Sequence, residues 1–191
     1  MQEKPLDGFR VAALVSTDFE QVELTEPKKA LEQAGARVQI VSPVRGQVQG
    51  MRHDQKADTF SVDLPLEQAR VDDFDGLLIP GGTLNADQLR VVLLAQQFAQ
   101  QFDEADRPIA VICHGPWLLV SSSLVHGRTL TSYHTLKDDI RNAGGRWLNK
   151  EAVRDRNWVS SRSPHDIPAF NREMIALFRE YAAVPQRRRA A

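Results

Sequence analysis

The amino-acid sequence predicts one doubly wound α/β domain, in which helices cover both faces of a mainly parallel β-sheet. Short apolar runs recur at 9–15, 76–80 and 108–112, as is typical of buried parallel strands. Amphipathic stretches lie between these runs, and strands that alternate with helices build a parallel sheet. No internal repeat, low-complexity segment or linker interrupts the pattern, so the 191 residues are expected to form a single domain with its core at about 9–182.

Apolar or alternating runs predict strands, in chain order, at 9–15, 37–42, 76–80, 108–112, 129–133, 146–149 and 153–161. The first run is followed by Ser16, and the third by the pair Gly81 and Gly82. The polar stretch 46–63 contains Gly50 and short alternations, which favour a hairpin at the rim of the sheet.

Helical spacing of apolar residues predicts helices at 22–34, 64–71, 84–103, 116–120, 135–143 and 168–182. Gly35 ends the first helix, because glycine readily adopts the left-handed conformation common there. Pro27 lies inside that helix and must occupy its first turn or kink it. Gly144 ends the helix at 135–143 in the same way as Gly35.

Composition excludes several classes of partner. The net charge of −1 does not indicate a nucleic-acid-binding surface. The basic tail at 184–191 is expected to be a solvated chain end. No apolar run approaches the roughly 20 residues that span a bilayer, and residues 1–9 lack the apolar core of a signal peptide. A single cysteine excludes an internal disulfide and fits a reducing compartment. We therefore expect a cytoplasmic protein without nucleic-acid or membrane partners.

The most informative stretch surrounds Cys113, the only cysteine. The buried strand at 108–112 ends there, and Gly115 and Pro116 open a second apolar run suited to a helix. A sharp strand-to-helix turn at one reactive side chain is the arrangement of a nucleophile elbow, and a helix N-terminus favours the thiolate. The alternative is that Cys113 is a small buried hydrophobic residue, as lone cysteines commonly are.

The strands that precede Ser16, Gly81 and Cys113 are expected to end at the same edge of the sheet, where doubly wound proteins bind their ligands. Gly81 or Gly82 is predicted to contribute a backbone N–H to an oxyanion hole, together with the N–H of His114. A plain strand-to-helix turn is the alternative for the glycine pair. No Walker lysine motif and no G-x-G-x-x-G pattern occurs, so no nucleotide cofactor is expected.

Acidic residues crowd the start of the first helix, at Asp18, Glu20, Glu23 and Glu26. Most of them are explained by solvation and by complementarity to the helix dipole. One carboxyl group could still point at the Cys113 sulfur and share a proton with it. The residues alone do not choose between Glu20 and Glu23.

His114 is the obvious base for Cys113 and needs an orienting partner, for which Asp87 is a candidate. Capping of the following helix is the alternative role of Asp87. Tyr133 and Arg162 end strands near the same edge and are predicted to contact substrate. Because the remaining histidines show no ligand spacing and a second cysteine is lacking, no metal site is expected; these are His53, His126, His134 and His165.

Taken together, the motifs resemble the PfpI family of the ThiJ/PfpI superfamily. Ala110–Pro116 is similar to the A-x-C-H-G-P elbow of that family, Asp18–Leu24 to its acidic first loop, and Leu78–Gly82 to its glycine-pair motif. Further similarity covers Thr131–Tyr133, Lys137–Asp139, Asn142–Gly144, Trp158–Arg162 and Pro168–Phe170. The resemblance extends over nearly the whole chain.

The resemblance implies a flavodoxin-like fold and a homodimer, built into a hexamer in some members. It implies Cys113 as nucleophile, His114 as its paired histidine and Glu23 as the protonated carboxyl on the sulfur, with Glu20 at a second acidic position. The third member of the family's triad is an acid from a neighbouring subunit, which Asp87 matches best. Ser163–Asp166 departs from the Gly-Pro-Glu-Asp of relatives, so His165 gains no catalytic support.

The first hypothesis for function is a stress-response hydrolase or hydratase that acts on reactive dicarbonyls such as methylglyoxal, or on their early protein adducts. In it Cys113 adds to the carbonyl carbon, Glu23 and His114 move protons, and no cofactor takes part. The alternatives are an intracellular cysteine peptidase and a redox-sensing or chaperone protein whose Cys113 is oxidised. A glutamine amidotransferase ranks last, because the chain lacks a downstream His-x-Glu pair.

Overall fold

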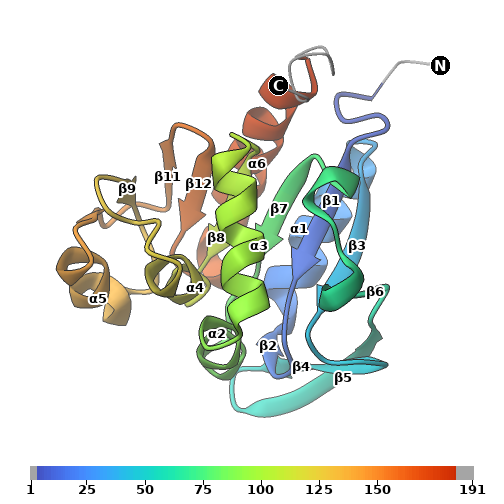
Figure 1. Cartoon of the computed structure of the whole chain (residues 1–191), viewed down its shortest axis with the longest axis horizontal. Helices are drawn as coiled ribbons and strands as arrows, with labels where there is room; N and C mark the ends of the chain where they lie inside the picture. The colour runs from blue at the N-terminus through green and yellow to red at the C-terminus, as the bar shows by residue number, and fades with distance from the viewer. Residues whose placement is uncertain (1–3, 184–191) are drawn as a thin grey trace.

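The computed structural model of the chain describes residues 4–183, so the basic tail at 184–191 lies outside the described residues. Seven strands form the central sheet in the order β11-β12-β8-β7-β1-β3-β6 (Figure 1). All neighbours are parallel except the antiparallel pair β11–β12. The strands are β1 (Arg10–Leu14), β3 (Arg37–Ser42), β6 (Leu64–Pro65), β7 (Gly76–Ile79), β8 (Ile109–Ile112), β11 (Ala152–Asp155) and β12 (Trp158–Ser161).

Helices cover both faces of this sheet, which confirms the doubly wound α/β architecture. Alternate residues of the central strands enter two separate hydrophobic clusters, because side chains of a strand point to opposite faces. In β8, Ala110 packs with residues of α1 and α6, whereas Val111 packs with residues of α3, α4 and α5. The helices are α1 (Gln21–Gln33), α2 (Thr83–Arg90), α3 (Leu93–Glu104), α4 (Pro116–Ser121), α5 (Lys137–Asn142) and α6 (Ile167–Ala182).

The polar stretch 46–63 forms the predicted hairpin, from β4 (Gln47–Arg52) and β5 (Gln55–Ser61). The hairpin belongs to a separate three-stranded sheet, in which β4 pairs with the short strand β2 (Phe19–Glu20) immediately before α1. A further pair joins β9 (Thr129–Leu130) to β10 (Arg146–Trp147), so the run predicted as a strand at 129–133 is shorter and lies outside the central sheet.

Two helix predictions are wrong. The single helix predicted at 84–103 is two helices, separated at Val91 and Val92, where Val92 has the extended conformation that precedes α3. Adjacent β-branched residues are poor helix formers, and the break lets α2 lie at the end of the sheet while α3 covers its face. The stretch 64–71 begins with β6 rather than a helix, because Pro65 restricts Leu64 to extended backbone.

Four 3₁₀ helices complete the described part of the chain: η1 (Leu66–Gln68), η2 (Val71–Asp73), η3 (His134–Leu136) and η4 (Pro164–Asp166). The strand predicted at 153–161 is a hairpin, because the chain turns at Arg156, which has a positive φ of 52°.

Pro27 is buried in α1 beyond its first turn. Within residues 4–183, no helix is both long enough and apolar enough to cross a lipid bilayer.

Candidate active site

Cys113 occupies the sharp turn between β8 and α4 and has a φ of 61°, which is strained for a residue with a side chain. The turn is held by the N–H of Gly115, which donates to Ile112 O at 2.9 Å, and by the N–H of Cys113, which donates to Ser161 O at 3.0 Å. Pro116 is the first residue of α4, where its missing N–H costs no hydrogen bond. The structure therefore contains the nucleophile-elbow geometry expected from the sequence.

The sulfur atom lies beside a pocket of about 510 Å³ at the carboxyl ends of the central strands. Cys113 is 6% exposed and belongs to the pocket lining, so it is not merely a packed apolar side chain. The other lining residues come from three regions: the first acidic loop (Asp18, Glu20, Glu23), the loop after β7 (Gly82, Thr83, Leu84), and segments around the rim (Met51, His53, His114, Tyr133, Thr135, Ser163, Pro164, His165).

Glu23, and not Glu20, is the carboxyl that contacts the Cys113 sulfur. Its Oε2 atom accepts the N–H of Gly81 at 2.9 Å, and the residue is fully buried. Burial, followed by the neighbouring charge of Glu20, raises the pKa of Glu23 to about 8. Its Oε1 atom has no hydrogen-bond partner within the described chain, which is consistent with a carboxyl group that keeps its proton at neutral pH.

Burial also raises the pKa of the Cys113 thiol, and the adjacent Glu23 raises it further. The N–H groups of Gly82 and His114 oppose this shift by hydrogen bonding to the sulfur. The sequence predicted that the helix N-terminus favours the thiolate. The N–H groups of Gly82 and His114 act in that direction, and burial acts against them.

The backbone N–H groups of Gly81 and Gly82 are directed at different partners. The N–H of Gly81 donates to Glu23 Oε2, which leaves Gly82 as the member of the pair available for the predicted oxyanion hole. The N–H of Gly82 faces the sulfur together with that of His114. Gly82 has a φ of 89°, and a Cβ there would come within 2.6 Å of Glu20 N. This close approach requires glycine.

His114 lies beside Cys113, with Nδ1 3.2 Å from Cys113 Sγ. Burial and, to a lesser extent, the charge of His134 lower the pKa of His114 to about 4, so its ring is neutral at physiological pH. Tyr133 stacks on the ring with 4.7 Å between centroids, and Trp117 meets it edge-on at 5.5 Å. The second ring nitrogen, Nε2, lies 3.4 Å from Thr83 Oγ1.

Three other predicted residues lie further from the sulfur. Glu20 lines the pocket and accepts the backbone N–H of His53 at 3.0 Å, so it supports the rim. Asp87 is exposed on α2 and makes no hydrogen bond to His114 within the described chain, where Nε2 faces Thr83. Arg162 is held by Asp166 and Asn149, and lies next to the lining residue Ser163 without lining the pocket itself.

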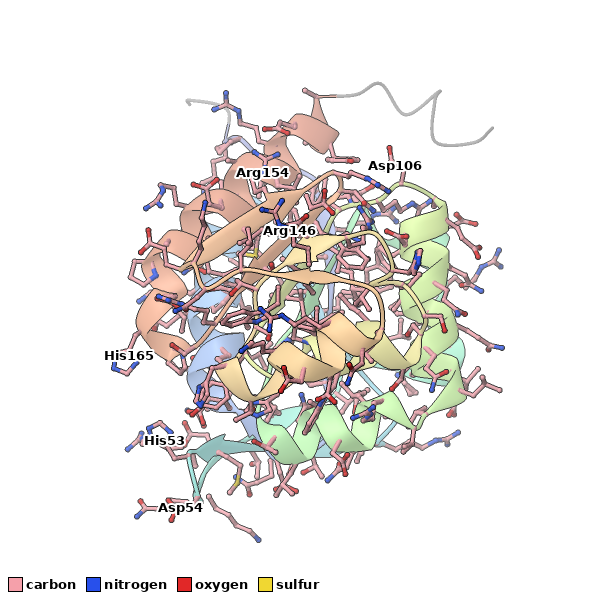
Figure 2. All side chains as sticks on the ribbon, turned by 90° about the vertical axis from the view of Figure 1, so that its left-hand side faces the viewer. His53, Asp54, Asp106, Arg146, Arg154 and His165 are labelled. Carbon is pink, nitrogen blue, oxygen red and sulfur yellow. The ribbon has the colours of Figure 1, made fainter. Side chains whose placement is uncertain are left out.

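Sequence reasoning missed most of the pocket rim. Met51 and His53 come from the β4–β5 hairpin, and His165 comes from η4. Figure 2 shows His53 and His165 projecting from the same side of the molecule. These segments are far apart in the chain, so no local spacing indicated their meeting. Thr83 directly follows the glycine pair in the sequence, and this adjacency could have indicated that Thr83 lines the pocket.

Across residues 4–183, no group of three or more histidine, cysteine or acidic side chains has the arrangement needed to hold a metal ion. The groups that contact the Cys113 sulfur are one buried carboxyl, one neutral imidazole and two backbone N–H donors. Together with the thiol, such a set can attack an electrophilic carbon, stabilise the oxygen that gains charge, and move protons.

The fold and this site define an α/β protein with a cysteine at its nucleophile elbow. Comparison of the sequence with known families matches residues 9–177 to the DJ-1/PfpI family. The chain is 40% identical over 171 residues to a deglycase of Pyrococcus abyssi, which covers 90% of this chain and 100% of the relative. It is 37% identical over 170 residues to the putative cysteine protease YraA of Bacillus subtilis, covering 89% and 98%. The chain belongs to the DJ-1/PfpI family.

The crystal structure of a ThiJ/PfpI domain protein from Brachyspira murdochii is similar in fold, with a TM-score of 0.83. The alignment covers 90% of this chain and 96% of that chain, at 19% sequence identity. The likeness confirms the flavodoxin-like architecture that the sequence resemblance implied.

Proposed function

We propose that the protein is a cysteine-dependent hydrolase or hydratase that acts on reactive dicarbonyls such as methylglyoxal, or on their early adducts. The observation that carries the proposal is the position of Cys113 Sγ at a pocket wall, beside the Glu23 carboxyl and 3.2 Å from His114 Nδ1. The similar sequence of the Pyrococcus abyssi deglycase supports it. Every group that the reaction needs comes from the chain, so we propose no cofactor.

The reaction begins when Cys113 Sγ adds to the aldehyde carbon of methylglyoxal and its thiol proton passes to His114 Nδ1. The former carbonyl oxygen accepts hydrogen bonds from the N–H groups of Gly82 and His114 and then gains a proton, which gives a hemithioacetal. A proton leaves the same carbon while the neighbouring carbonyl oxygen gains one, which gives an enediol. The neighbouring carbon then gains a proton and the hydroxyl group on the first carbon loses its own, which gives a thioester. Glu23 and His114 are the titratable groups available for this exchange. Water then cleaves the resulting thioester, which yields lactate and restores the thiol.

The test is lactate formation from methylglyoxal in buffer without glutathione, followed by NMR. The purified protein should form lactate, whereas Cys113→Ala and Cys113→Ser should reduce the rate to background. Arg45→Ala is the control, because Arg45 pairs with Glu67 on the exposed surface far from the reaction. Equal lactate formation by the wild type and Cys113→Ser would overturn the proposal.

A cysteine peptidase is the second candidate, supported by the similarity to YraA and by the surface of α2. Leu84 is 56% exposed and Val91 is 76% exposed, and helical spacing places Asp87 on the same face. We propose that this face meets a second copy of the chain in a homodimer or larger assembly and presents Asp87 to a neighbouring site. A sedimentation experiment should show an oligomer that Val91→Glu weakens, with peptide cleavage lost in Asp87→Asn. A monomer that cleaves no peptide would contradict this candidate.

A further inference from the structure

His114 must carry its single ring hydrogen on the correct nitrogen to act as a base. A neutral imidazole has one nitrogen that donates and one that accepts, and its neighbours select between the two tautomers. Here Nδ1 faces Cys113 Sγ at 3.2 Å, and Nε2 faces Thr83 Oγ1 at 3.4 Å. If the hydrogen were on Nδ1, that nitrogen would be unable to accept the thiol proton.

The proposed reaction requires the ring hydrogen on Nε2. Both His114 Nδ1 and the Glu23 carboxyl contact the Cys113 sulfur. In the proposed reaction Nδ1 takes the thiol proton, which requires a free lone pair on that nitrogen. The single ring hydrogen must then be on Nε2, where Thr83 Oγ1 is the neighbour.

Thr83 is suited to receive that hydrogen. It is the first residue of α2, directly after Gly82, and it lies at the exposed edge of the pocket. Its hydroxyl can donate to solvent and accept from Nε2 at the same time. Tyr133 and Trp117 contact the ring from the other directions, so the imidazole cannot easily turn towards a different partner.

We infer that Thr83 is the positioning residue of the site: its Oγ1 accepts the Nε2 hydrogen of His114 and so keeps Nδ1 free to take the Cys113 proton. An acid performs this task in many catalytic triads, whereas the group that faces Nε2 within the described chain is an uncharged hydroxyl. The inference rests on the proposed function, in which His114 is the base for Cys113.

The tautomer can be observed directly in protein labelled with ¹⁵N-histidine. Two-bond ¹H–¹⁵N spectra distinguish a protonated ring nitrogen from an unprotonated one, and His114→Asn assigns the His114 signals. In the wild type, the His114 signals should show hydrogen on Nε2. In Thr83→Val, which keeps the shape of the side chain and removes the hydroxyl, the signals should shift towards the other tautomer. Thr83→Ser should show the wild-type pattern.

Turnover of methylglyoxal should follow the same order. Thr83→Val should lower kcat by roughly tenfold with little change in KM, within the range expected for impaired general-base catalysis, and Thr83→Ser should recover most of the loss. Hydrogen on Nδ1 in the wild type, or the same tautomer in all three proteins, would overturn the role of Thr83. The proposed function fails separately, if Cys113→Ala still forms lactate while the tautomers behave as inferred.

Discussion

The Oε2 atom of Glu23 accepts the backbone N–H of Gly81 at 2.9 Å, so α1 is joined to the loop after β7 beside the Cys113 sulfur. This contact holds a carboxyl group that is fully buried and protonated at neutral pH. It also explains why only the second glycine of the pair has an N–H directed at the sulfur.

The pH dependence of stability should report the protonation of Glu23. Its pKa is about 8 in the folded protein and 4.5 when unperturbed, so the folded state binds this proton more tightly. The stabilisation is complete below pH 4.5 and is lost as the pH rises through 8. Urea unfolding from pH 5 to 9 should therefore show the stability of the wild type falling relative to Glu23→Gln, by about 1 kcal/mol or more. If the stability of the wild type and of Glu23→Gln changed with pH in the same way, the raised pKa of Glu23 would be contradicted. Glu26→Gln, on the exposed face of α1, is the control.

The reactivity of Cys113 should increase at alkaline pH. Burial and Glu23 raise the pKa of the thiol, so iodoacetamide should modify it slowly at pH 7 and faster above pH 9. In Glu23→Gln the repulsion between carboxylate and thiolate is absent, and the rate profile should move to lower pH. Mass spectrometry of the Cys113 peptide measures the rate. A profile that is unchanged or moves to higher pH in Glu23→Gln would show that the two groups are not coupled.

Gly81→Ala should disrupt the site. The added Cβ would meet Glu23 Oε2 at 2.5 Å, Cys113 Cβ at 2.7 Å and His114 N at 2.9 Å, so three parts of the site would have to move. We expect loss of turnover and destabilisation by about 2 kcal/mol or more, as for overpacked cores. Gly127→Ala is the control, because its Cβ meets nothing within 4 Å and only its φ of 70° is unfavourable. Equal effects of the two substitutions on turnover would argue against a tightly packed site.

Arg128 should be important for stability and not for catalysis. It is 5% exposed, bonds Asp103 and Asn157, and lies over the Trp158 ring at 4.0 Å. Arg128→Ala should lower the free energy of unfolding by about 3–5 kcal/mol, because it removes the cation that pairs with the partly buried Asp103 carboxylate. Arg45→Ala, which breaks an exposed ion pair, should cost about 1 kcal/mol or less. A comparable cost for both, in thermal or urea unfolding, would contradict this account.

The strand and helix pattern around Cys113 could be predicted because the determinants are local. Buried strands, the glycine pair and the Gly115-Pro116 helix start are properties of neighbouring residues, and β7, β8 and α4 lie where these signals indicated. The predictions failed where distant contacts decide. Pro65 restricts Leu64 locally, but the pairing with β3 completes the strand β6. The break at Val91 and Val92 is also local, but its result depends on the place that α2 takes at the end of the sheet.

The sequence by itself determined the doubly wound architecture, the strained turn at Cys113 and the set of acids from which its partner would come. Tertiary structure decided which acid this is, because only the meeting of α1 with the loop after β7 brings Glu23 to the sulfur and leaves Glu20 at the rim. It also decided the direction in which the pKa of the thiol is shifted. Burial depends on every segment that covers the atom, and here its effect exceeds that of the local dipoles that favour a thiolate.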